Sequence, residues 1–296
     1  MIAIISAVIP VGLIVLVGYL AGKKLQIDLS SLSRLSLYVL FPALVADSLY
    51  RTTLSAENAA GIFLGFTLTY FLLCLFAWVL GQRFSLSLPV QKSLIATTAF
   101  PNNGNMGLPV TFFALGEAGL ERAVVYMIAS SIIIFTTAPA FLRGGGFASA
   151  VGFTLRLPLL WSVFLGLSLH WLDLELPFKL DESLHILAQA AIPIALLILG
   201  MHIASSPLEL KPYEAGASFM RLIGGAIAAY LVGTVLGLTG LDLQVLILQS
   251  AMPAAISSFL MVNEFGGDAA RTARVVVLST LLAFLTLPVV MLVIQG

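Results

Sequence analysis

The chain has 296 residues, of which 60% are hydrophobic and 9% are charged, and its mean hydropathy is +1.08. An ordinary soluble domain carries about 25% charged residues, and a water-soluble fold cannot hide so large an apolar fraction from solvent. The 14 basic and 14 acidic residues give a net charge of +0, so no basic surface for nucleic acid is expected. These numbers exclude a soluble enzyme, a nucleic-acid-binding protein and a disordered chain.

Apolar runs long enough to cross a bilayer as helices, about 20 residues each, recur along the whole chain. They occupy residues 1–22, 29–50, 57–80, 89–115, 119–142, 150–172, 182–204, 212–238, 243–264 and 271–294. Lipid offers no hydrogen-bond partner to an open backbone, so each run should be helical. The first run lacks a basic segment before it, which favours a retained helix over a cleaved signal. The sequence therefore predicts an all-α polytopic membrane protein with ten transmembrane helices.

The basic residues predict the orientation of these helices. The connections after the first, third, fifth, seventh and ninth helices hold 11 of them, with Arg221 counted among these, and the opposite side holds the other three of the 14, Arg51, Arg122 and Lys179. Loops rich in Lys and Arg stay in the cytoplasm. We therefore expect a multi-pass protein of the cell membrane with both termini outside.

Prolines recur at a nearly constant offset, which indicates an internal repeat. The pairs are Pro10 and Pro158, Pro42 and Pro193, Pro101 and Pro253, and Pro139 and Pro288, so the offsets are 148, 151, 152 and 149 residues. The pattern predicts one five-helix repeat over residues 1–148 and a second over 149–296. Because five is odd, the second repeat must enter the membrane from the other side, as in many secondary transporters.

The fourth expected helix contains a polar interruption, Ala99-Phe100-Pro101-Asn102-Asn103-Gly104-Asn105-Met106-Gly107-Leu108-Pro109. Pro101 has no N–H and clashes with the preceding turn, so the helix should break there. We expect Asn102 or Asn103 to cap the second half-helix. The N-terminal amides of that half-helix would form an anion site without a formal charge.

The ninth expected helix carries the counterpart of this interruption at Pro253, which should free the carbonyl of Gln249. The small residues Ala254 and Ser257 follow, and they would let a second backbone approach closely. If the two breaks cross, two positive helix ends meet. The sequence therefore predicts a carboxylate site made of backbone amides and Asn side chains, with no fixed cation.

The two interruptions resemble the signatures of one known family. Pro101-Asn102 to Met106-Gly107-Leu108-Pro109 is similar to the span-4 signature of the auxin efflux carrier family, which includes the plant PIN-FORMED carriers and bacterial malate-permease-like proteins. Ala251-Met252-Pro253 through Phe259, followed by Asn263-Glu264-Phe265, resembles the span-9 signature. The resemblance covers essentially the whole chain. It implies an elevator-type carrier in which helices 1, 2, 6 and 7 form a dimerising scaffold, and helices 3–5 and 8–10 form a moving transport domain.

The resemblance also implies site residues at the crossing of helices 4 and 9. The plant carriers have a Gln and a Tyr near the substrate in span 5, where this chain has Ser130 and Phe135. They tend to have Gln and Lys where this chain has Ala254 and Asn263, and many have a long loop that is missing here. These departures favour another carboxylate over auxin. The predicted substrate-binding residues are Asn102, Asn103, Asn105, Ser130, Phe135, Ala254 and Ser257, with Pro101, Gly104 and Pro253 at the crossover.

The leading interpretation is a secondary active or facilitative transporter of small organic anions, such as auxin-like acids or malate. We expect it to work as a homodimer in lipid, with no cofactor, metal or nucleic acid. The alternative is a sodium-coupled organic-anion symporter similar to the bile-acid sodium symporters, with proton or sodium coupling at Glu264 and Gln249. Glu264 is also explained as an interfacial acid beside Arg271 or Arg274, and Asp47 as an i,i+4 partner of Arg51. No His-Glu-x-x-His or Ser–His arrangement suggests an enzyme.

Overall fold

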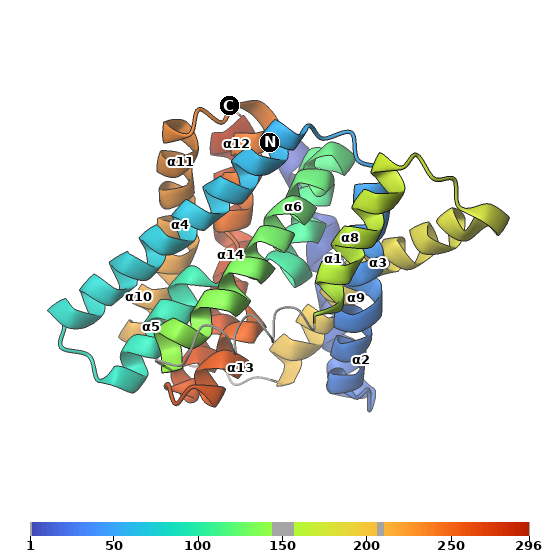
Figure 1. Ribbon diagram of the computed structural model, residues 1–296. Helices are drawn as coiled ribbons and strands as arrows, with labels where there is room; N and C mark the ends of the chain where they lie inside the picture. The colour runs from blue at the N-terminus through green and yellow to red at the C-terminus, as the bar shows by residue number, and fades with distance from the viewer. Residues whose placement is uncertain (1, 144–156, 206–209, 296) are drawn as a thin grey trace.

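The computed structural model describes residues 2–143, 157–205 and 210–295, and these parts are built from helices (Figure 1). The proposed repeat boundary at 148/149 and the basic Arg156 lie outside the described residues. The main helices are α1 (Ile2–Lys24), α2 (Leu29–Leu35), α3 (Phe41–Tyr50), α4 (Ala56–Arg83), α5 (Leu88–Ala99), α6 (Leu108–Arg143), α8 (Pro158–Trp171), α9 (Leu180–Ser205), α10 (Pro212–Phe219), α11 (Gly225–Val235), α12 (Gly240–Ser250), α13 (Ile256–Glu264) and α14 (Ala269–Gln295).

Wide π-helical turns join several of these helices. They are η1 (Ser36–Leu40) between α2 and α3, η2 (Asn103–Gly107) before α6, and η4 (Met220–Gly224) between α10 and α11. Such turns occur mostly as single-turn bulges and are frequent at functional sites. Because η1 and η4 are themselves helical turns, the expected segments 29–50 and 212–238 are helical along most of their length.

The expected loop between the fourth and fifth helices is a kink. Gly116 lies inside α6 with φ +67, and helix continues on both sides of it. A positive φ is the left-handed conformation that glycine adopts without a Cβ penalty. Two helices therefore meet at this one residue, where we expected a short connection.

Six segments of the described chain are long and apolar enough to cross a membrane, by length and composition. They are Leu29–Tyr50, Ala56–Arg83, Asn103–Ala138, Pro177–Ser205, Pro212–Val235 and Ala269–Ile294. The surface of the protein is also apolar, since large side chains such as Leu13, Leu75 and Trp161 are exposed on the helices. The protein is therefore a multi-pass membrane protein.

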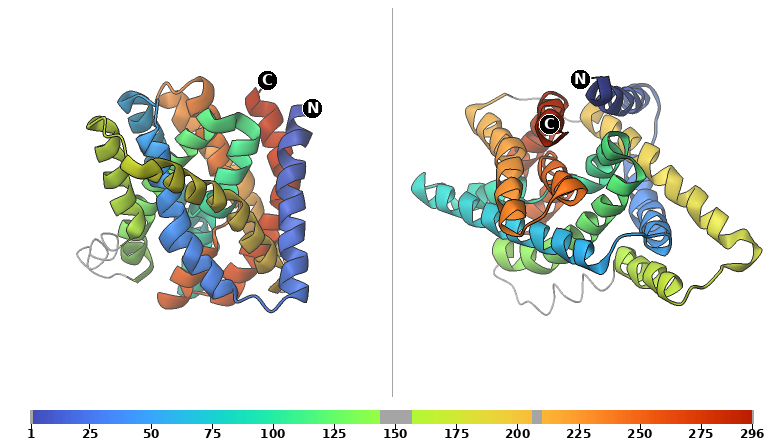
Figure 2. Two further views of the ribbon diagram at one scale, coloured as in Figure 1. Left: turned by 90° about the vertical axis from the view of Figure 1, so that its right-hand side faces the viewer. Right: turned by 90° about the horizontal axis from the view of Figure 1, so that it is seen from above.

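Helices from the two halves of the chain pack into two groups. In the first group α1 packs on α9, and α3 packs on α8 and α9. Gly200 permits the closest approach, because a Cβ there would lie 2.1 Å from the Val15 carbonyl oxygen of α1. In the second group α4, α5 and α6 pack with α10 to α14. Viewed from above, α4 and α11 lie on one side and α8 and α9 on the other (Figure 2).

The start of α1 and the end of α14 lie at the same end of the molecule (Figures 1 and 2).

The aromatic part of the core lies in the second helix group. The Phe66 and Tyr126 rings are 4.9 Å apart, and the Tyr70 and Phe100 rings are 6.2 Å apart. Phe100 directly precedes Pro101, so this core packs against the first predicted interruption.

Candidate functional site: the crossing of two interrupted helices

Both predicted interruptions are present. Helix α5 ends at Ala99 and helical structure resumes at Asn103, while α12 ends at Ser250 and α13 begins at Ile256. The cause is local, since a proline removes one ladder hydrogen bond and its ring excludes the preceding carbonyl. Helices α5 and α13 lie toward one end of the molecule, and α12 lies toward the end that holds both termini (Figure 1).

The two interruptions cross each other as extended backbone. Pro101 and Ala254 form an antiparallel bridge. The Asn102 amide donates to the Pro253 carbonyl at 2.8 Å, and the Ala255 amide donates to the Phe100 carbonyl at 2.9 Å. The four ends of the two broken helices therefore meet at one place, two with carbonyl groups and two with amide groups.

The two amide ends lack acceptors. Within the part of the chain that the structure describes, the backbone N–H groups of Asn103, Gly104 and Asn105 have no hydrogen-bond acceptor, and neither do those of Ile256 and Ser257. All five residues are half-buried. The first N–H groups of a helix have no partner within the helix and carry its positive partial charge. The crossing thus presents two sets of donors suited to an anion.

The N-terminal amides of helix α2, in contrast, bind a carboxylate of the chain itself. The Asp28 carboxylate accepts from the Ser30 and Ser31 amides, each at 3.1 Å. The Ser31 hydroxyl and these amides lower the pKa of Asp28 from its ordinary value of 3.8. A side-chain carboxylate therefore caps the start of α2. The residues that precede η2 and α13, Asn102 and Ala255, make no side-chain capping hydrogen bond.

The expected capping by asparagine is wrong. Asn102 precedes η2 but its side chain makes no capping hydrogen bond, and it is only 4% exposed with its Nδ2 unpartnered among the described residues. The Asn103 side chain turns to α6 instead, where it donates to the Ser130 hydroxyl. That hydroxyl donates in turn to the Met127 carbonyl at 2.9 Å. The structure therefore brings Asn103 and Ser130 together, as two of the predicted site residues.

Other predicted residues take different positions. Ala254 is buried and its amide donates to Ser279 at 3.1 Å, while Asn105 and Ser257 are half-buried at the amide ends. Phe135 is half-buried and packs on the main core. Asn105 and Ser257 are therefore partly exposed at the amide ends, and Ala254 is part of the backbone crossing.

The two residues of the proposed ion-coupling pair have different surroundings. Gln249 is fully buried at the end of α12, where its Nε2 donates to Thr111 at 2.9 Å. Glu264 is exposed at the last residue of α13. Arg271 pairs with Asp268 at 3.0 Å and Arg274 pairs with Glu214 at 2.8 Å, and the explanation of Glu264 as an interfacial acid stays a prediction.

The carbonyl ends of the broken helices bind a cation that we had placed in a loop. Arg221 lies in η4, inside the segment Pro212–Val235, and is 1% exposed. Its guanidinium donates to the carbonyls of Thr98, Ser250 and Met252, the last at 3.1 Å. The count of loop charges thus becomes ten against three, and the expectation of a crossing without a fixed cation is wrong. A signal was available, because an ionisable residue inside an apolar span is a functional candidate.

A cavity of about 140 Å³ adjoins the crossing between α9, α13 and α14. Its wall includes Ile256, which is the first residue of α13, and its polar side chains are His202 and Thr280. Apolar side chains such as Leu199 and Phe259 form the rest of the wall. The cavity therefore lies where the two helix groups face each other, beside one amide end.

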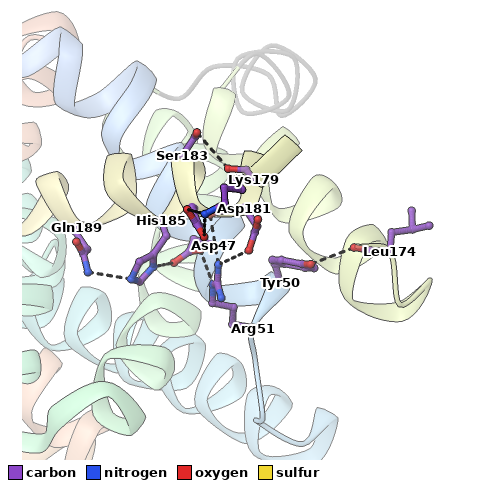
Figure 3. Close-up of polar contacts among 10 residues, drawn as sticks. Asp47, Tyr50, Arg51, Leu174, Lys179, Asp181, Ser183, His185 and Gln189 are labelled. Carbon is purple, nitrogen blue, oxygen red and sulfur yellow. Dashed lines mark hydrogen bonds and ion pairs between the residues drawn. The ribbon is translucent and has the colours of Figure 1, made fainter. Parts of the chain in front are cut away.

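A second polar cluster lies between α3 and α9 (Figure 3). Asp47 is 6% exposed and accepts from Arg51 Nε at 2.9 Å, as the i,i+4 spacing predicts. This hydrogen bond raises the pKa of Arg51 above its ordinary value. His185 Nδ1 is 2.8 Å from the other Asp47 oxygen, and Gln189 contacts the far side of the same ring. Sequence spacing missed His185, because it is distant in the chain.

The chain is similar to known membrane transporters. Residues 3–146 and 153–291 match the family model described as membrane transport protein. The chain is 28% identical over 291 residues to an uncharacterized transporter of Methanothermobacter thermautotrophicus, with 96% of each chain covered. It is 25% identical over 304 residues to a putative malonate transporter of Rhizobium meliloti, covering 96% of this chain and 93% of that protein. It is 28% identical over 135 residues to auxin efflux carrier component 1 of Arabidopsis thaliana, covering 45% of this chain and 21% of the relative.

Proposed function

The chain belongs to the membrane transport protein family that includes the auxin efflux carriers, and on this premise we propose that it carries small organic anions across the cell membrane by alternating access. The family and the relatives are transporters, so the protein is not an enzyme. The site is the crossing of the two interrupted helices. The substrate is a carboxylate that the amide ends bind in place of water.

One observation carries this proposal, namely the two half-buried amide ends that have no acceptor of their own. The amides of Asn103 to Asn105 and of Ile256 and Ser257 can donate to carboxylate oxygens. The Asp28 carboxylate at the start of α2 is the local precedent for that contact. Hydrogen bonds to a charged group contribute about 1.5–3 kcal/mol each, so a few such amides suffice for a reversible carrier site.

Buried polar atoms around the crossing support the same site. Thr98 Oγ1, Asn102 Nδ2, Gln249 Oε1 and Ser258 Oγ have no partner among the described residues. Buried polar groups are nearly always hydrogen-bonded, and an exception needs a reason. A polar substrate, with the water that accompanies it, supplies partners of both kinds.

The packing supports an elevator with ten membrane crossings. We propose that α1, α2, α3, α8 and α9 form the scaffold, which also dimerises, and that α4 to α6 with α10 to α14 form the transport domain. The two groups pack mainly within themselves, and the cavity lies between α9 of one and α13 and α14 of the other. The two five-helix repeats run in opposite directions across the membrane, and both termini lie outside.

Uptake into proteoliposomes tests the proposal. The purified full chain is reconstituted and offered a panel of labelled mono- and dicarboxylates, including malonate because one relative is named for it, with and without proton and sodium gradients. We expect saturable uptake of at least one carboxylate and none of matched neutral amides. Uptake of the neutral amides at the same rate, or of no carboxylate at all, contradicts the proposal.

A further inference from the structure

The guanidinium of Arg221 satisfies the carbonyl ends of both broken helices at once. Thr98 and Ser250 each lie three residues before a crossing proline, so they are equivalent positions of the two interrupted helices. In an unbroken helix their carbonyls would accept from the amides of residues 102 and 254. Those amides donate elsewhere, to Pro253 and to Ser279. Arg221 replaces both lost hydrogen bonds and also donates to the Met252 carbonyl.

The charge of Arg221 is not balanced by a carboxylate. Among residues 2–143, 157–205 and 210–295, the structure gives Arg221 no acidic partner. Its counter-charge is the negative partial charge at the C-terminal ends of α5 and α12. A buried cation is retained only when its donors are well satisfied. Two carbonyls from helix ends and one from the second interruption meet that condition.

Backbone carbonyls at the ends of interrupted helices are also what coordinates a free Na⁺ in many secondary transporters. We infer that Arg221 is a tethered cation that occupies this carbonyl site, so the crossing needs no dissociable metal cation to hold its two negative helix ends together. Arg221 is a positioning residue, because it contacts backbone and keeps the two amide ends in register. The inference rests on the proposed function only for its transport measurements.

The backbone beside Arg221 lies unusually close to the second interrupted helix. Arg221 is the second residue of η4, and a Cβ at Gly225 would lie 2.1 Å from the Ser250 carbonyl oxygen and 2.5 Å from an Arg221 nitrogen. The backbone of α11 therefore approaches α12 at the very carbonyl that the guanidinium binds. Position 225 must stay small for the site to close.

Removal of the cation tests the inference directly. In Arg221→Ala we expect transport to fall by at least about tenfold and the melting temperature to drop. Millimolar guanidinium chloride should then raise the melting temperature of the variant in a concentration-dependent way and recover transport. Urea, the neutral isostere, should do neither, and wild type should respond to neither. A variant that ignores guanidinium, or responds equally to urea, overturns the inference.

Wild type provides a test that does not depend on the variant folding. Transport should be unchanged when all Na⁺ and K⁺ is replaced by N-methyl-D-glucamine at constant pH gradient. A loss of transport on that replacement overturns the inference, because the site would then need a free cation. The melting measurements need no substrate. A guanidinium-specific shift without carboxylate uptake therefore contradicts the proposed function alone, and uptake without such a shift contradicts the tethered cation alone.

Discussion

The carbonyl ends and the amide ends of the two broken helices differ in whether the chain supplies them with a hydrogen-bond partner. The carbonyl ends of α5 and α12 share one buried guanidinium that belongs to the chain. The amide ends at η2 and α13 have no partner within the described residues. We propose that the helix ends with a permanent counter-ion stay constant during transport and that the helix ends without one exchange their ligand. Under that proposal, the amide side of the crossing contacts the substrate.

The largest expected effect comes from forcing the carbonyl side apart. Gly225→Ala places a Cβ 2.1 Å from the Ser250 carbonyl oxygen, and backbone cannot yield as a flexible side chain can. We expect a loss of about 1–3 kcal/mol of stability, typical of overpacking, together with loss of transport. Thermal unfolding of the purified protein measures the first. Gly224→Ala is the matched control, because the nearest atom there, Met220 Cγ, is at 3.6 Å. Equal melting temperatures for the two variants would contradict the close approach.

The next effect comes from the amide side. Asn102→Ala should lower transport by at least about tenfold, the value of one lost hydrogen bond to a charged group, while the melting temperature stays close to that of wild type. The fold tolerates the change because Asn102 Nδ2 has no partner to lose among the described residues. Initial uptake rates and thermal unfolding are measured on the same preparation. An unchanged rate removes Asn102 from the site.

A smaller effect is expected one step away from the substrate. Ser130→Ala removes the hydroxyl that accepts from the Asn103 side chain. That side chain then loses its fixed orientation, while the backbone N–H of Asn103 stays in place. We expect uptake to fall by about fivefold, since a neutral hydrogen bond contributes about 1 kcal/mol. Ser131→Ala, at the neighbouring half-buried position, serves as the control. A loss as large as that of Asn102→Ala would place Ser130 in direct contact with the substrate.

The smallest effect concerns the amide end that carries its own carboxylate. The pKa of Asp28 is lowered in the folded protein, so its contribution to stability is present above the ordinary pKa of 3.8 and is lost as the pH falls through the lowered value. Between about pH 5 and pH 3, the melting temperature of wild type should therefore fall slightly more than that of Asp28→Asn. Transport at neutral pH should be unaffected. Parallel melting curves over this range would show that the cap contributes nothing.

The interruptions themselves were predictable because their cause is local. Pro101 and Pro253 lack an amide hydrogen wherever they are placed, and the polar run from Asn102 to Asn105 is unfavourable in an apolar helix unless it lines a cavity. The same holds for the pairing of Asp47 with Arg51, which the 3.6-residue period brings together. By contrast, His185 joins that pair from α9, and no spacing in the sequence indicates it.

A helical membrane protein with two broken helices could be predicted without any tertiary information, because composition, apolar length and proline chemistry act within one segment at a time. Three outcomes came from the folded chain alone: the breaks meet as a backbone bridge, Asn103 turns to Ser130 rather than capping its helix, and Arg221 binds the carbonyl ends of both broken helices. These outcomes depend on hydrogen bonds between segments far apart in the chain. A charge in an apolar run indicates burial, but its partner is set by what packs against it.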